Sequence, residues 1–467
     1  MVSGSVTRVD ILAGNTLRGR AQERSVMRAM RAAAMSMVAI GVLCASPANA
    51  LPSFAMQTDQ PCSACHVGAY GPRLTQFGRD FKLYGYVAND TKEHTLPISV
   101  MGEFSFTHID KDQVAKALNN SNDNAAVDAI SLFYAGKLFN KVGAFIEVAY
   151  DAVEKSLHWE DFDIRYAKEF KVFNSDAVIG ATVNNSPSIG DLWDTKPAWS
   201  FPFVESSYQT SPSAEFIVDK LPSTVFGAGG YAMFDDTIYV ELDLYGGLSH
   251  GVLRALGTEP LNGADSLDGP TVYWRANWQR EWEEGRHYVS LGTLGSHTDV
   301  YPGGVQGFGS DAYTDVGFDA TYQWTAKPEL STSDRLSVHL LFLQEAADLN
   351  ASHLLAGTRP TASLTTTRAE VAYSFGATYT PTVQYFQTHG STDLAFWQTP
   401  NGDPGSNGWI FEMDYVPWGK PDAPLSWLNG RFALQYTSYD KFDGARAGAS
   451  DNNTLILSLN LALAANR

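Results

Sequence analysis

Cysteine is scarce in this chain of 467 residues. There are three cysteines, and Cys44 lies in an N-terminal segment with the pattern of a removable export signal. The other two, Cys62 and Cys65, are only three positions apart, which excludes a disulfide framework. A structural zinc site would need two further ligands at suitable spacing, and no second cysteine pair exists. The remaining pair must therefore serve another chemistry.

Long apolar runs and positive charge are also lacking. No stretch after residue 50 approaches the roughly 20 apolar residues of a membrane-spanning helix, so any membrane crossing must use strands. Charged residues make up 18% of the chain, and its net charge is −18. The first fifty residues carry net +4, which leaves about −22 for the rest. Such an acidic chain is not expected to bind nucleic acid, although it would attract cations.

Residues 1–50 are predicted to be an export signal. Arg28 and Arg31 supply its positive region, residues 35–44 are apolar, and Ala48-Asn49-Ala50 is a small-residue cleavage site. The mature chain would then begin at Leu51. Residues before about position 27 do not belong to the signal pattern, and we interpret them as the result of a start codon assigned too far upstream.

The cysteine pair is followed directly by histidine, in the run Cys62-Ser63-Ala64-Cys65-His66. Two thiols three positions apart share one face of a helical turn and can add to both vinyl groups of a porphyrin. The next residue then offers its imidazole to the iron. We predict one covalent haem c bonded to Cys62 and Cys65, with His66 as an axial ligand. Attachment of such a haem outside the cytoplasm agrees with the export signal.

The segment available to cover this haem is short. Residues 51–97 form the predicted monohaem cytochrome segment, in which Leu74, Phe77 and Phe81 predict an amphipathic helix over 75–84. Its apolar face would cover the porphyrin. So small a segment rarely holds a core alone, and we therefore expect it to dock against or inside the remainder of the chain.

The distal haem ligand is open between several residues. Met56 is too near the attachment loop to reach the iron easily, and His108 is a further candidate. Met101 is favoured because it falls on the inward set of the first strand, where a thioether would raise the reduction potential. His94 is the alternative, and absence of a protein ligand stays possible.

Residues 98–467 show repeated alternation of apolar and polar side chains. In residues 238–244, for example, Ile, Val, Leu and Leu alternate with Tyr, Glu and Asp. This period of two, apolar outside and polar inside, is typical of a transmembrane β-barrel with strands of about ten residues. We predict sixteen antiparallel strands beginning near 98, 127, 141, 159, 175, 224, 237, 270, 286, 313, 334, 366, 378, 408, 430 and 452.

The expected connections alternate in length. Short turns are predicted at 140–141, 235–236, 283–285 and 379–381, and long loops at 110–126, 185–223, 247–269, 298–312, 347–365, 389–407 and 441–451. Short turns at one end and long loops at the other are typical of an outer-membrane barrel with a periplasmic N-terminus. A soluble sandwich is the competing fold, while a propeller would need a repeat that is absent. The predicted fold class is mostly β, with a small α-helical cytochrome segment before the barrel.

About forty residues resemble a known family. The runs 51–55, 62–66 and 74–86 are similar to the fused monohaem cytochrome–porins, which include outer-membrane iron-oxidising cytochromes. Met56 and the Tyr70-Gly-Pro-Arg73 run depart from that pattern. The resemblance implies a haem at or within a sixteen-stranded pore. It also implies transfer of electrons from an extracellular donor, with Fe²⁺ favoured, to a periplasmic cytochrome or other carrier.

Two alternative functions stay open: electron transfer from a non-iron donor, and a porin or uptake channel with a structural or sensory haem. Inward-facing carboxylates are expected at Glu103, Glu147, Glu241 and Asp243. They could draw Fe²⁺ inward because hard oxygen ligands suit a divalent cation. Porin lumens are polar in any case, so these residues alone do not identify the donor. The expected surroundings are outer-membrane lipid.

Overall fold

The computed structural model describes residues 52–87, 97–114, 120–187, 189–193, 195, 202, 204–423 and 427–464. The predicted export signal, Leu51 and His94 lie outside the described residues. Among the residues described, no helix is long and apolar enough to cross a membrane.

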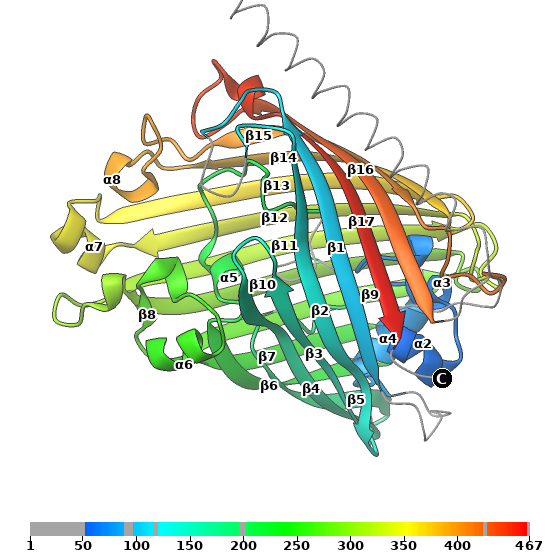
Figure 1. Ribbon diagram of the computed structural model, residues 1–467. Coiled ribbons are helices and arrows are strands. Elements are labelled where there is room, and N and C mark those ends of the chain that lie inside the picture. The colour runs from blue at the N-terminus through cyan, green and yellow to red at the C-terminus, as the bar shows by residue number, and fades with distance from the viewer. Residues whose placement is uncertain are drawn as a thin grey trace, which may run out of the picture. The chain divides into compact units, whose positions relative to one another are not determined.

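Within the described residues, sixteen long strands and one two-residue strand form a single antiparallel sheet that closes on itself (Figure 1). Closure comes from the pairing of the first and last strands, in which Met101 lies opposite Ala462. The strands are β1 (Ile98–Ile109), β2 (Asn124–Phe139), β3 (Val142–Asp151), β4 (Ser156–Val172), β5 (Ser175–Asn184), β6 (Val225–Phe234), β7 (Ile238–Gly247), β8 (Ser266–Leu267), β9 (Thr271–Trp282), β10 (His287–Tyr301), β11 (Asp311–Thr325), β12 (Arg335–Asp348), β13 (Thr361–Ser374), β14 (Tyr379–Gly390), β15 (Ser406–Tyr415), β16 (Leu428–Lys441) and β17 (Thr454–Ala464).

Side-chain alternation sets the two faces of the barrel wall. In β7, Leu242 and Leu244 are exposed on the outside while Glu241 and Asp243 are buried in the lumen. Successive side chains of a strand point to opposite faces, so the apolar members form the outer surface, as a membrane barrel requires. The prediction that Glu241 and Asp243 face inward is confirmed.

The sixteen predicted strand starts all lie within five residues of the observed ones, and the largest difference is at β13, which begins at Thr361. The predicted turn at 379–381 is wrong, because Tyr379 already pairs in β14 and the turn is 375–378. Short connections gather at the end where β1 begins. Two connections at this end are longer than the rest. They span 326–334 and 416–427, and neither was predicted as a loop.

Residues 52–87, the plug, lie inside the barrel at the short-turn end (Figure 1). Its elements are α2 (Pro52–Thr58), α3 (Cys62–Cys65), the 3-10 turn η1 (Val67–Ala69) and α4 (Gln76–Leu83). Thr75 caps α4 by accepting a hydrogen bond from the Gly78 amide, which satisfies one of the free amide donors of the first turn. The helix begins and ends within one residue of its predicted bounds.

A second segment also enters the lumen: the connection between β5 and β6, here called the inward loop, whose described parts are 185–187, 189–193, 195, 202 and 204–224. Ser206 accepts a hydrogen bond from Ser105 of β1, and the Ile217 amide donates to Glu345 of β12. The loop therefore joins two separate parts of the wall. It contains α5 (Ile217–Lys220), while the other loops carry α6 (His250–Ala255), η2 (Leu261–Gly263), η3 (Pro302–Gly304), α7 (Asn350–Ala356), α8 (Leu394–Trp397) and η4 (Ala449–Asn452).

Candidate functional site: a cavity between plug and barrel wall

A cavity of about 600 Å³ lies between the plug and five neighbouring strands. Its volume falls in the range of about 300–1,000 Å³ that is usual for small-molecule and cofactor sites. The strands β16, β17, β1, β2 and β3 form its outer boundary, here called the cavity wall. Six aromatic side chains line it, namely Phe54, Tyr70, Phe81, Tyr86, Phe133 and Phe145. The site is thus a largely apolar chamber inside a polar lumen.

Cys65 and His66 both line this cavity. Burial lowers the pKa of His66 to about 4, and the backbone of Gly71 only partly offsets that effect. The imidazole is therefore neutral at physiological pH, which is the form that binds metals. Burial also raises the pKa of the Cys65 thiol to about 12, so this group is a protonated thiol rather than a thiolate.

Cys62 takes a different position from Cys65. It is fully buried and does not line the cavity, and the Asn429 amide donates a hydrogen bond to its sulfur at 3.2 Å. The adjacent Ser63 amide donates to the carbonyl of Gly419, in the turn between β15 and β16. Burial raises the pKa of Cys62 as well. The two cysteines form no disulfide.

The predicted distal ligands are separated by the structure. Met101 lines the cavity from β1, and the Tyr70 hydroxyl donates to its sulfur at 3.1 Å. Met56 does not line the cavity. His108 lies at the long-loop end of β1, where its ring bonds Asp123 at 2.7 Å. Met101 and His66 are thus the two candidate ligands that share one chamber.

The expected apolar face of α4 is only partly correct. Phe81 and Leu74 line the cavity, but Phe77 is 43% exposed and lines no part of it. The helix instead buries Arg79 and Lys82. The reason is the polar lumen, which offers acidic and carbonyl partners to cationic side chains where a soluble core would offer none.

The four predicted carboxylates do not form one group. Glu103 and Glu147 line the cavity. Glu241 and Asp243 lie on β7, where a Cβ built on Gly190 of the inward loop would lie 2.7 Å from Glu241 Oε1. In the described part of the chain, no three histidine, cysteine or acidic side chains are placed to hold a metal ion.

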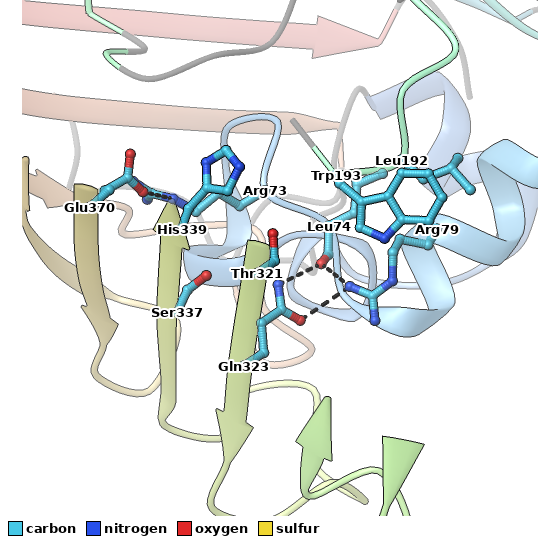
Figure 2. Close-up of a pocket in the computed structure, with 10 residues that line it drawn as sticks. All are labelled: Arg73, Leu74, Arg79, Leu192, Trp193, Thr321, Gln323, Ser337, His339 and Glu370. Carbon is cyan, nitrogen blue, oxygen red and sulfur yellow. Dashed lines mark hydrogen bonds and ion pairs between the residues drawn. The ribbon is translucent and has the colours of Figure 1, made fainter. Parts of the chain in front are cut away.

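The opposite side of the plug rests on β11, β12 and β13, here called the anchor wall. Figure 2 shows Arg73 paired with Glu370 of β13, with Nε to Oε1 at 2.8 Å. Arg79 Nη1 donates to Gln323 of β11 at 3.2 Å and stacks on Tyr288 at 3.7 Å. A space of only about 20 Å³ is left here, about the size of one water molecule.

Sequence reasoning missed Arg73, Arg79, Glu370 and Tyr70 as site residues. The charge of the segment could have pointed to its basic residues. Residues 52–87 contain more basic residues (Arg73, Arg79 and Lys82) than acidic ones, although the whole chain has net charge −18. Basic residues in a buried segment need partners, and an acidic lumen supplies them. Nothing in the sequence identifies Glu370, which lies 297 positions from Arg73.

No family model matches this chain, and no curated protein matches it. Similar solved structures include the outer membrane channel DcaP of Acinetobacter baumannii, with a TM-score of 0.43, 12% identity, and 78% of this chain and 96% of that chain covered. For an anion-selective porin from Comamonas acidovorans the values are 0.41, 9%, 78% and 98%. For a loop-deletion mutant of OmpT from Vibrio cholerae they are 0.40, 8%, 78% and 97%. TM-scores below 0.5 are too low to assign the fold from these structures. The barrel fold is therefore established by the strand pairing described above.

Proposed function

We propose that the chain is an outer-membrane electron-transfer protein of the cytochrome–porin type. One c-type haem would be bonded to Cys62 and Cys65 and ligated by His66. The observation that carries the proposal is a single chamber of about 600 Å³ inside a closed barrel, lined by Cys65, the neutral His66 and Met101. Bound there, the group would supply one-electron exchange. Cys62 does not line the chamber, so attachment through its sulfur would require a rearrangement that brings this buried side chain to the chamber.

The residues around the chamber suit such a group. The aromatic side chains exclude water from it and offer flat apolar surfaces. Lys82 and Arg431 line the same chamber, and cations of this kind pair with carboxylates such as those of a porphyrin. The plug residues would thus bind and orient the group, while the barrel wall shields it from lipid and from bulk water.

The architecture supports a direction of transfer. The outer surface is apolar, and the plug lies at the short-turn end, which in outer-membrane barrels faces the periplasm. A periplasmic carrier could then approach the plug, while the donor arrives from the long-loop end. The inward loop and the plug both occupy the lumen, which would hinder passage of an oxidised iron product. Glu103 and Glu147 place carboxylates in the chamber, and this supports Fe²⁺ as donor.

The test uses the purified full-length protein in detergent. We expect a pyridine haemochrome band and reduction of the haem by Fe²⁺ in stopped-flow mixing. A panel of organic, sulfur and cuprous donors distinguishes iron from other electron sources. The matched control is the Cys62→Ala, Cys65→Ala double variant, which should fold as a barrel but hold no covalent haem. A wild-type protein with no haemochrome band would refute the proposal.

A second candidate, a solute channel with a structural or sensory haem, is favoured by a different observation. Among the residues that the structure describes, several buried lumen atoms have no hydrogen-bond partner in the protein, including both amide atoms of Asn277 and the hydroxyls of Thr321 and Thr382. Such atoms imply internal water. Conductance of the Cys62→Ala, Cys65→Ala variant equal to that of the wild type, with a haem that no donor reduces, would favour this function.

A further inference from the structure

Tyr70 and Met101 approach each other across the chamber from two different parts of the chain. Tyr70 follows η1 in the plug, whereas Met101 belongs to β1 of the cavity wall. The Tyr70 hydroxyl lies 3.1 Å from the Met101 sulfur and donates to it. The tyrosine ring itself is held from its other side by Arg431 of β16, whose guanidinium carbon lies 5.1 Å from the ring centroid. Contacts on both the ring and the hydroxyl therefore hold Tyr70 in place against Met101.

A thioether is an unusual choice of partner for a buried phenol. Sulfur is a weak acceptor, and Glu103 lines the same chamber from the same strand as a much stronger one. The hydroxyl is nevertheless directed at Met101. The sulfur has a second lone pair that this contact does not use. Met101 and His66 line one chamber, so the sulfur could serve as a second ligand to a metal held by His66.

We propose that Met101 is the distal iron ligand and that Tyr70 is a positioning residue that raises the reduction potential by its hydrogen bond to the ligand sulfur. This inference rests on the proposed function. A thioether favours ferrous over ferric iron, and it is the ligand that raises the potential of c-type cytochromes. A donor on the sulfur withdraws electron density from it and weakens its bond to ferric iron more than to ferrous iron. Outer-shell partners of metal ligands commonly have this tuning role.

The consequence is a site suited to weak reductants. An acceptor for Fe²⁺ needs a high reduction potential, because Fe²⁺ is a weak reductant. Each change that stabilises the reduced haem therefore extends the range of usable donors. Tyr70 belongs to the plug and Met101 to the barrel, so the potential would depend on correct docking of one against the other. A loosened plug would lose both the ligand and its hydrogen bond.

The experiment compares three single variants of the haem-loaded, full-length protein. Met101→Leu removes the ligand, Tyr70→Phe removes only the hydroxyl while keeping the ring beneath Arg431, and Met233→Leu removes a buried thioether outside the chamber. Each is measured by redox titration, by the weak red band of a methionine–ferric-haem bond, and by binding of carbon monoxide to the reduced form.

For Met101→Leu we expect loss of the band, rapid carbon monoxide binding, and at least a tenfold shift of the redox equilibrium toward ferric iron, about 59 mV. For Tyr70→Phe the band stays, and the equilibrium shifts the same way by less than tenfold. Met233→Leu matches the wild type. An unchanged band and potential in Met101→Leu would overturn the ligand, and an unchanged potential in Tyr70→Phe would overturn its role. Both results leave a haem that Fe²⁺ reduces, so the proposed function would survive them.

Discussion

The two sides of the plug meet the barrel in opposite ways. On the anchor wall, ion pairs and hydrogen bonds fill the contact and leave about 20 Å³. On the cavity wall, a mixture of polar and apolar side chains borders a space of about 600 Å³. Arg73 fixes the segment to Glu370, while Cys65 and His66 in the same short segment face the chamber.

The difference shows how a segment of 36 described residues can be held firmly and still keep a large open space beside it. Charged contacts are directional, so a few of them on one side are enough to orient the plug. The other side keeps local contacts around the chamber, such as the hydrogen bond from Asn429 to the Ala69 carbonyl and the stacking of Phe54 on Phe145. A plug held evenly all round would close the chamber, because protein interiors pack to high density wherever side chains can reach.

The largest effect is expected from breaking the anchor. Glu370→Ala leaves Arg73 buried without its carboxylate, and loss of one partner of a buried pair costs about 3–5 kcal/mol. Hydrogen exchange of the plug amides should accelerate accordingly. In the paired control, Arg73→Met with Glu370→Leu, most of the protection should return. Equal exchange in Glu370→Ala and wild type would show that this pair does not hold the plug.

A pH-dependent effect is expected at the mouth of the barrel. Burial raises the pKa of Asp80 to about 6, and Asp236 and Glu281 add to this shift against the opposing effect of Arg79. Because the folded pKa is above the unfolded one, this group's stabilising contribution is present below about pH 4 and is lost as the pH rises through about 6.

Asp80→Asn should therefore stabilise the protein by about 2–3 kcal/mol at pH 7 and change little at pH 4. Urea titrations at both pH values measure the difference. Asp348→Asn, at an exposed position at the end of β12, is the control and should leave both midpoints unchanged. A similar gain at both pH values would contradict the assignment.

The same added volume should have opposite consequences on the two walls. Ser337 lines the small anchor space, and Ala462 lines the chamber. Ser337→Leu should cost about 1–3 kcal/mol through overpacking, whereas Ala462→Leu should cost close to nothing in the haem-free protein. Thermal unfolding of the two variants side by side makes the comparison. Equal destabilisation would mean that the chamber is closed in solution.

The smallest effect is expected on the chamber side of the attachment turn. Asn429 donates to the Ala69 carbonyl at 3.0 Å as well as to Cys62. Asn429→Ala should cost about 1 kcal/mol, seen as faster hydrogen exchange confined to residues 62–69. Asn407→Ala, which removes a hydrogen bond to Asp440 near the barrel surface, is the control. Faster exchange across the whole plug would show that the two sides are not independent.

The barrel strands could be predicted because their sequence pattern is contained within each strand. Alternation within each strand follows from one apolar and one polar surface, so the run 238–244 already indicates β7. The helix at Gln76–Leu83 was predicted for the same reason, from its spacing. Its buried face was not, because Arg79 is buried only through partners on β9–β11 that the sequence does not place beside it.

The chamber itself could not be foreseen. It depends on the register by which β1 meets β17, which brings Met101 opposite Ala462, and on the Arg73–Glu370 pair across the lumen. Cys62, Cys65 and His66 were predicted as haem residues from their spacing alone, and of the three the structure places Cys65 and His66 in the lining of the chamber. The inward loop was predicted only as a long connection, because nothing in its composition shows that it folds into the lumen.

The burial of Cys62 constrains the order of events during biosynthesis. Its sulfur is fully buried beside Gly419 in the connection between β15 and β16, where a Cβ on that glycine would lie 3.0 Å from it. That connection and the closing strand β17 belong to the last part of the chain to be made. Any enzyme that modifies this thiol must reach it before the C-terminal strands close the barrel over it. Maturation of the N-terminal segment and insertion of the barrel are then successive steps, and the first cannot be repaired after the second.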